Sequence, residues 1–227
     1  IAEQQPALAD QFVTLHAAYR NAGQRLQIVD EALGADQADG SRLPWEEVRD
    51  WFHNAGNYVD VLDRAAELLG DKLRGTQATP ALEGLELYLR NALSVSLVYA
   101  GSAGLRDYDA QMGHLIIDQG QPVESQRFQL AHQLSALALH DEISLVVEQA
   151  GLRTAAARQL LSVGLANYAA GALLMPYTRF REDARTVRHD IDRLRQQFGV
   201  SFEQACHRLS TLQRPSARGI PFFFCRV

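Results

Sequence analysis

The stretch Arg127-Phe128-Gln129-Leu130-Ala131-His132-Gln133-Leu134-Ser135-Ala136 lies in a helical pattern that is expected to run over residues 123–150. His132 and Ala136 are four residues apart and therefore share one face of this helix. A second helix is expected over residues 153–175, because a proline follows it. The two patterns together predict a helical middle of the chain.

Downstream, the pattern remains helical almost to the end. A polar helix is expected over residues 182–198. Ser201 and Gln204 form a capping box, which predicts the start of a last helix that ends near Leu212. Residues 219–227 favour a strand.

Upstream, apolar residues recur at alternating steps of four and three, as on one face of a helix. One stripe runs through Leu8, Phe12, Leu15, Tyr19, Ala22, Leu26, Val29 and Leu33. A second helix is expected to start at Pro44 and end at Gly70, with the stripe Val48, Phe52, Ala55, Val59, Leu62, Ala66 and Leu69. The two helices predict a long N-terminal αα-hairpin, in which the stripes pack on each other or against a second copy of the chain.

Between this hairpin and the long helix the period changes. A short helix is expected over residues 79–92. Residues 94–100 and 113–118 are rich in Val, Leu, Ile and Tyr between Gly-rich turns, which is typical of strands. Residues 105–112 form either a third strand or a loop. The sequence therefore predicts an α+β fold that is predominantly helical, with a small sheet.

The composition narrows the class of protein. The chain has 227 residues, of which 47% are apolar and 22% charged, as is ordinary for a globular protein. Cys206 and Cys225 do not form a CxxC pair, which argues against a disulfide framework or a zinc ribbon and fits a reducing cytoplasm. No apolar run reaches the roughly 18 residues that a membrane span needs. Because the chain begins with Ile1, we expect it to be a part of a longer protein.

The net charge of −5 is unevenly distributed. Residues 1–150 carry 10 basic and 22 acidic side chains, whereas residues 151–227 carry 12 basic and 5 acidic ones. This asymmetry indicates an anionic partner for the C-terminal half or contact between the halves. A basic cluster, Arg179, Arg181, Arg185 and Arg188, is expected to be mainly a solvated face. The overall acidity argues against this chain binding DNA by itself.

The segment around His132 resembles the zinc-binding helix of the ImmA/IrrE-type metallopeptidases, whose pattern reads RF-x-LAHELGH. The run Ala166-Asn167-Tyr168-Ala169-Ala170-Gly171-Ala172-Leu173-Leu174-Met175-Pro176 resembles the AN-x-FAA-x-LLMP block of the same family. In such a motif two histidines one turn apart bind Zn²⁺, and the glutamate polarises the bound water.

The departures from this motif decide the expected chemistry. Gln133 stands where the family has the glutamate, and Ala136 stands where it has the second histidine. The third ligand of the family is an acid shortly before the second block, and residues 162–165 contain none. The resemblance therefore implies the fold without a hydrolytic zinc site, and it makes His132 a hydrogen-bonded pocket or core residue.

A second resemblance extends to the C-terminal end. The run Gly199-Val200-Ser201-Phe202-Glu203-Gln204-Ala205-Cys206-His207-Arg208-Leu209-Ser210-Thr211-Leu212-Gln213-Arg214-Pro215 and the run Gly219-Ile220-Pro221-Phe222-Phe223-Phe224 are similar to the short-chain fatty acyl-coenzyme A regulator family. Members are transcription factors with an N-terminal helix-turn-helix, a degenerate ImmA/IrrE-like middle and a C-terminal domain that opens with such a strand. The resemblance implies an effector-sensing part of a regulator, which binds DNA only through a helix-turn-helix outside this sequence.

The resemblance also implies a domain plan and partners. Residues 1–78 would form a hairpin for oligomerisation, residues 79–212 a degenerate ligand-sensing domain, and residues 213–227 the first strand of a truncated domain. The effector would be a short-chain acyl-CoA or CoA, with propionyl-CoA favoured, bound by a cytoplasmic homodimer or higher oligomer that is neither an enzyme nor a membrane protein. No metal is expected here. An iron–sulfur cluster in the full-length protein stays open, because the two cysteines of this chain cannot close one.

A pocket for acyl-CoA would need cations for the phosphates, a flat surface for adenine and an apolar end for the acyl group. Since a lost metal site can become a ligand pocket, we expect it within reach of His132 and Tyr168, on the sheet side of the long helix. The candidate ligand-binding residues are Tyr19, Arg20, Lys72, Arg74, Tyr99, Arg106, His132 and Tyr168.

Two other functions remain open from the sequence. A pure oligomerisation or protein-interaction module, built on the two helical stripes, would bind no small molecule. A surviving zinc metallopeptidase would contain stoichiometric zinc, against which the missing ligands argue.

Overall fold

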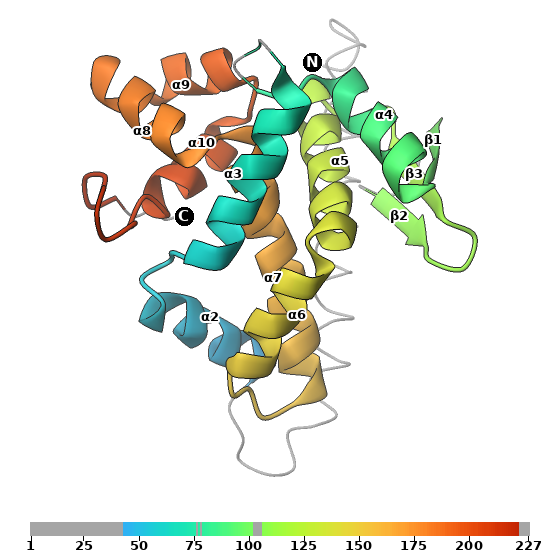
Figure 1. The fold of residues 1–227 in the computed structure, drawn as a ribbon, viewed down its shortest axis with the longest axis horizontal. Coiled ribbons are helices and arrows are strands. Elements are labelled where there is room, and N and C mark those ends of the chain that lie inside the picture. Colours follow the sequence, from blue (N-terminus) through green and yellow to red (C-terminus); the bar gives the residue numbers. More distant parts are fainter. Residues whose placement is uncertain (1–42, 76, 78, 102–105, 223–227) are drawn as a thin grey trace, which may run out of the picture. The chain divides into compact units, whose positions relative to one another are not determined.

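The computed structural model describes residues 43–75, 77, 79–101 and 106–222. Most of the described chain is helical, with one small sheet, so the predicted α+β class is confirmed (Figure 1). The expected helix through residues 8–33, and with it the N-terminal half of the hairpin, lies outside the described residues. The chain divides into two compact units, Ile1–Glu47 and Val48–Val227, and the second contains the features described below.

The expected single helix from Pro44 to Gly70 is wrong. Helix α2 spans Pro44–Asn54 and helix α3 spans Asp60–Arg74, with an irregular segment between them. Gly56 and Asn57 in that segment have φ angles of 63° and 55°, which a right-handed helix does not allow. Helix α3 also continues past the glycine that was expected to end it.

The sheet has three strands in the order β1-β3-β2. Helix α4, Leu82–Leu93, precedes β1, Ser96–Ala100, and β1 pairs in parallel with β3, His114–Asp118. Strand β2, Arg106–Asp109, pairs antiparallel with β3. The question of a strand or a loop over residues 105–112 is thus settled by a short strand.

The expected continuous helix over residues 123–150 is also wrong. Helix α5 ends at Ala138 after starting at Val123, and helix α6 spans His140–Gln149. Leu139 between them has a φ of −114° and a ψ of 28°, outside the helical range, while its side chain is buried in the core. Helix α7, Ala155–Leu174, follows, and the side chain of Thr154 caps it by accepting a hydrogen bond from the amide of Ala157.

The C-terminal region contains three short helices. The polar segment forms helix α8, Tyr177–Thr186, and helix α9, Ile191–Phe198, in place of one expected helix over residues 182–198. Positive φ angles at Arg188 and His189 separate them. Helix α10, Phe202–Ser210, begins with the predicted capping box. Residues 219–222 do not form the expected strand, and residues 223–227 lie outside the described part.

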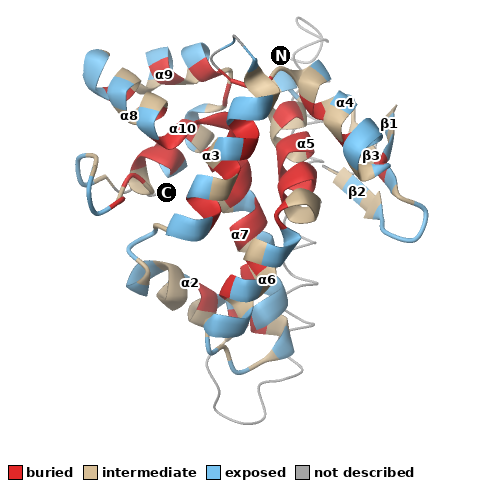
Figure 2. Ribbon diagram, in the orientation of Figure 1, coloured by how far each residue is buried: buried red, intermediate tan, exposed pale blue. Residues whose placement is uncertain are grey.

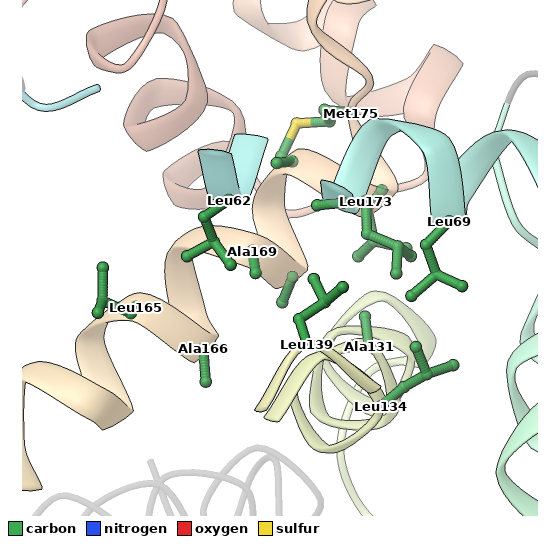
Figure 3. Close-up of a cluster of buried hydrophobic side chains, with 14 of the residues drawn as sticks. Leu62, Leu69, Ala131, Leu134, Leu139, Leu165, Ala166, Ala169, Leu173 and Met175 are labelled. Carbon is green, nitrogen blue, oxygen red and sulfur yellow. The ribbon is translucent and has the colours of Figure 1, made fainter. Parts of the chain in front are cut away.

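The core of the second unit is formed mainly by helices α3, α5 and α7, where buried positions gather (Figure 2). Figure 3 shows leucine and alanine side chains of these three helices packed together. A Cβ atom on Gly70 would lie 2.6 Å from the carbonyl oxygen of Leu173, so α3 and α7 touch backbone to backbone.

The contact between α3 and α7 bears on the expected domain plan. The compact unit begins at Val48, so α3 shares one core with the helices after residue 79. A separate oligomerisation role for residues 1–78 therefore remains a functional proposal.

Among the described residues, no single helix is long and apolar enough to cross a membrane. Helices α7 and α8 pass that test, on length and composition alone, only as a pair bent by 62°.

Candidate functional site

A cleft of about 850 Å³ is lined by residues of α5, α7 and α10 together with the end of α2 and the C-terminal segment. Phe52, Phe128 and Phe222 give it an apolar part. Gly164 on α7 allows the ring of Phe52 to approach the helix closely, since a Cβ atom there would lie 3.1 Å from that ring. The size of the cleft is within the range of small-molecule sites, roughly 300–1,000 Å³.

The polar part of the cleft includes the first turns of two helices. Ser125 lies in the first turn of α5, and Ser201 and Gln204 flank the start of α10. Ser201 Oγ accepts from the amide of Gln204 at 3.1 Å, and the Gln204 side chain accepts from the amide of Ser201 at 2.9 Å. Helix N-termini favour anions, and the cleft also contains Arg49 and His207, opposed by the acid Glu203.

His132 lies one helical turn beyond Phe128 on the same helix, and its ring has two hydrogen-bond partners. Arg106 Nη1 donates to its Nδ1, and the ring donates to the backbone carbonyl of Val163. Burial, followed by the charge of Arg106, lowers the pKa of His132 to about 3. Burial also lowers the pKa of Arg106. The imidazole is therefore neutral near pH 7, and its lone pair faces a guanidinium.

This geometry bears on the metal question. A zinc-binding histidine offers an unprotonated ring nitrogen to the metal, and here Arg106 already donates to that nitrogen. Residues 162–165 stand where the family has its third ligand, and Val163 of this stretch contacts His132. The contact is made by the backbone carbonyl of Val163 and not by a carboxylate. Among the residues that the structure describes, no group of three or more His, Cys, Asp or Glu side chains is placed to hold a metal ion.

Tyr168 connects the cleft to a buried carboxylate. It lines the cleft, and its hydroxyl donates to Asp63 Oδ2 at 2.8 Å and accepts from the amide of Val59 at 3.2 Å. Burial, followed by the charge of Asp63, raises the pKa of Tyr168 well above its usual value. Tyr168 is therefore a neutral hydrogen-bond donor that is already engaged.

Asp63 is fully buried and bonds to two arginines. Arg208 Nη1 donates to Asp63 Oδ2 at 2.7 Å, and Arg214 Nη2 donates to Asp63 Oδ1 at 3.1 Å. Arg214 Nη2 also donates to Glu67 Oε2 at 2.9 Å. We call Asp63, Glu67, Arg208 and Arg214 the Asp63 cluster; its two carboxylates balance its two guanidinium groups.

The remaining predicted site residues do not join the cleft. Arg74 pairs with Asp71 at 2.7 Å, and Lys72 is exposed on the same helix. The Tyr99 hydroxyl donates to Glu86 on α4. Tyr19 and Arg20 lie outside the described residues. The structure thus brings Arg106 and His132 together, places Tyr168 at the cleft, and leaves Lys72, Arg74 and Tyr99 elsewhere in the described part.

Of the two cysteines, the structure describes one. Cys206 is a buried free thiol on α10, and burial raises its pKa. Cys225 lies outside the described residues.

The Asp63 cluster was not predicted from the sequence. One signal was present, because Asp63 lies four residues after Val59 and three before Ala66, on the apolar side of its helix. An acid there must find a buried partner or remain unpaired. Its partners, Arg208 and Arg214, are 145 and 151 residues away, and nothing in the local pattern identifies them.

Comparison with known proteins defines the class of protein. Residues 99–210 match the family model of the IrrE N-terminal-like domain, Peptidase_M78. The match confirms the resemblance to the ImmA/IrrE-type fold. Residues 99–210 are therefore similar to an IrrE N-terminal-like domain, and His132 and Tyr168 lie on helices of this matched range.

The relatives narrow this class to particular proteins. The chain is 43% identical to a protein of Cereibacter sphaeroides named propionyl-CoA carboxylase regulator. It is 37% and 36% identical to the Mycobacterium tuberculosis proteins named HTH-type transcriptional regulators RamB and PrpR. These matches cover at least 98% of this chain but at most 48% of each relative, so the chain spans about half the length of the curated relatives it matches.

A solved structure agrees with these matches. It is described as a Mycobacterium tuberculosis transcriptional regulator and has a TM-score of 0.74 at 38% identity. The similarity covers 78% of this chain and 55% of that chain. The named relatives are transcriptional regulators, as the second resemblance implied.

Proposed function

We propose that this chain is the effector-binding part of a cytoplasmic transcriptional regulator that senses a short-chain acyl-CoA, with propionyl-CoA favoured. Binding would control genes of propionate and fatty-acid breakdown. The full protein would act as a homodimer or higher oligomer and would contact DNA through a helix-turn-helix outside these residues. In this proposal the chain is not an enzyme.

The observation that carries the proposal is the cleft on the helix pair of the IrrE-like fold. Its apolar part, at Phe52, Phe128 and Gly164, fits a short acyl chain. Its polar part, at the first turns of α5 and α10 and at Arg49, places the positive ends of two helices and a guanidinium group where a phosphate would be stabilised. The name of the Cereibacter sphaeroides relative supports propionyl-CoA metabolism as the regulated process.

His132 supports the proposal from a position beside the cleft, which it does not itself line. It lies one turn beyond Phe128, and Arg106 on β2 brings a cation to the same place. A ligand in the cleft that reaches this pair would meet a guanidinium and a neutral imidazole, which can bind a carbonyl or phosphate oxygen. Arg106, His132 and Tyr168 therefore remain our candidate ligand-binding residues, whereas Lys72, Arg74 and Tyr99 would need another part of the ligand. Tyr19 and Arg20 also remain candidates.

The proposal is tested by calorimetry and thermal unfolding with propionyl-CoA, acetyl-CoA and CoA. At about 100 times the dissociation constant, binding is expected to stabilise the fold by about 2.7 kcal/mol. The variant Asn167→Phe places a ring in the cleft from an exposed position of α7 and is expected to weaken binding at least about tenfold.

The matched control is Asn91→Phe, since Asn91 is exposed on α4 and does not line the cleft. It should bind like the wild type. No heat and no shift in the melting temperature at millimolar acyl-CoA would refute the proposed function. Equal binding by both variants would move the ligand away from this cleft.

A further inference from the structure

The wall of the cleft and the Asp63 cluster share hydrogen bonds. Tyr168 lines the cleft and donates to Asp63, as described above. Thr211 also lines the cleft, and its Oγ1 accepts from Arg208 Nη1 at 3.2 Å. The same nitrogen of Arg208 donates to Asp63. Two wall residues of the cleft are thus bonded directly to buried charges.

The other side of the Asp63 cluster holds the segment of residues 212–222. Arg214 is bonded to Asp63 and Glu67, and its Nε donates to the hydroxyl of Tyr58 at 2.8 Å. The Tyr177 hydroxyl accepts from the amide of Arg214 at 2.9 Å and donates to the carbonyl of Ala217 at 3.0 Å. The segment therefore depends on buried polar contacts for its position.

We propose that occupancy of the cleft is transmitted through the Asp63 cluster to residues 212–222, so that this segment is the output of the sensor. The inference rests on the proposed function for the identity of the ligand. Phe222, at the end of the segment, lines the cleft, so the segment also closes one wall of the ligand site.

The physical basis is the interdependence of the buried charges. Asp63 is fully buried and the Arg208 side chain is 2% exposed, so neither can exchange its partner for water. The cluster is therefore stable only when all its members are in place. When the segment opens, it withdraws Arg214 from the cluster and Phe222 from the cleft, and a ligand that holds the cleft closed opposes this opening.

Hydrogen exchange of residues 212–222 tests the inference in two steps, using Glu67→Gln and the control Glu83→Gln. Glu67 bonds to Arg214 but does not line the cleft, whereas Glu83 is exposed on α4. Without ligand, Glu67→Gln should speed exchange of residues 212–222 about tenfold, and Glu83→Gln should leave it unchanged. Equal exchange in both variants would overturn the inference, whatever the ligand.

The second step adds propionyl-CoA at about 100 times its dissociation constant. Exchange of residues 212–222 should slow about tenfold or more in the wild type and in Glu83→Gln. Glu67→Gln should bind with unchanged heat but show a smaller slowing than the wild type, because the ligand then acts on the segment only through Phe222. Binding without slowing in the wild type, or equal slowing in Glu67→Gln, would overturn the inference. Absence of binding would be visible by calorimetry and would refute the proposed function itself.

Discussion

Two arginine contacts in this protein differ in what the arginine faces. Arg106 donates to the neutral imidazole of His132, whereas Arg208 donates to the fully buried carboxylate of Asp63. The first contact joins a charge to a neutral ring, and the second belongs to a balanced set of four charges. The difference teaches that the contact at the helix resembling a peptidase site leaves an arginine facing a neutral group, whereas the contact between α3 and α10 pairs opposite charges.

The largest expected effect comes from breaking the charge balance of the Asp63 cluster. Asp63→Asn would leave the two guanidinium groups of the cluster with Glu67 as its one carboxylate, and we expect a loss of about 3–5 kcal/mol in the free energy of unfolding. Urea denaturation measures it. The exposed Asp107 on β2 provides the control, because Asp107→Asn should change stability by less than about 0.5 kcal/mol. A similar small change for Asp63→Asn would show that the cluster is not coupled as described.

A smaller effect is expected from returning one part of the metallopeptidase motif. Gln133 is buried, so Gln133→Glu should cost roughly 1–3 kcal/mol and should raise the pKa of the new carboxyl group. The variant supplies no second or third ligand, and we expect no zinc by elemental analysis and no peptidase activity. The partly buried Gln129, one turn earlier, serves as the control through Gln129→Glu. Stoichiometric zinc in Gln133→Glu would contradict the interpretation that the region around His132 does not bind zinc.

The pH dependence of stability distinguishes the two regions further. The pKa of His132 is about 3 in the folded protein and about 6.5 in an unfolded chain, so the unfolded state binds more protons between these values. Stability should therefore fall as the pH drops below about 6.5, by up to about 1.4 kcal/mol per pH unit from this residue. Urea midpoints between pH 7.5 and 5 should show a flatter profile for His132→Asn. If His132→Asn and the exposed control His140→Asn had identical profiles, the pH dependence of stability could not be assigned to His132.

The smallest effect is expected at Arg106. Arg106→Met removes the donor to His132 and should cost only about 1 kcal/mol, because a neutral imidazole is left behind. Loss of the nearby positive charge should also raise the pKa of His132, which an NMR titration of the imidazole measures. Arg90→Met, at an exposed position of α4, is the control. A cost as large as that of Asp63→Asn would remove the contrast between the two regions.

The sequence predicted elements where local chemistry determines them. The capping box at Ser201 and Gln204 marks the start of α10, and Pro44 marks the start of α2. The breaks inside the long helices were harder to predict. Gly56-Asn57 is a weak local signal for a left-handed turn, but Arg188 and His189 adopt positive φ angles without one.

The candidate site was predicted only in part, for a related reason. His132 and Tyr168 came from motif positions, and the structure places both on the helix pair that the motif implied. The partners of these residues are set by tertiary contacts, such as Arg106 with His132 and Tyr168 with Asp63. Contacts between residues so distant in the chain leave no periodic trace in a single sequence.

Gly70 has a mechanical consequence. Because α3 and α7 approach so closely at Gly70 and Leu173, the space for one helix to move toward the other is used up at this point. The two helices therefore form a stiff pair, and one wall of the cleft belongs to this pair through Gly164, Asn167 and Tyr168. Any change of shape that a ligand causes must then be taken up by the opposite wall, where α10 and the segment after it are attached by side chains alone.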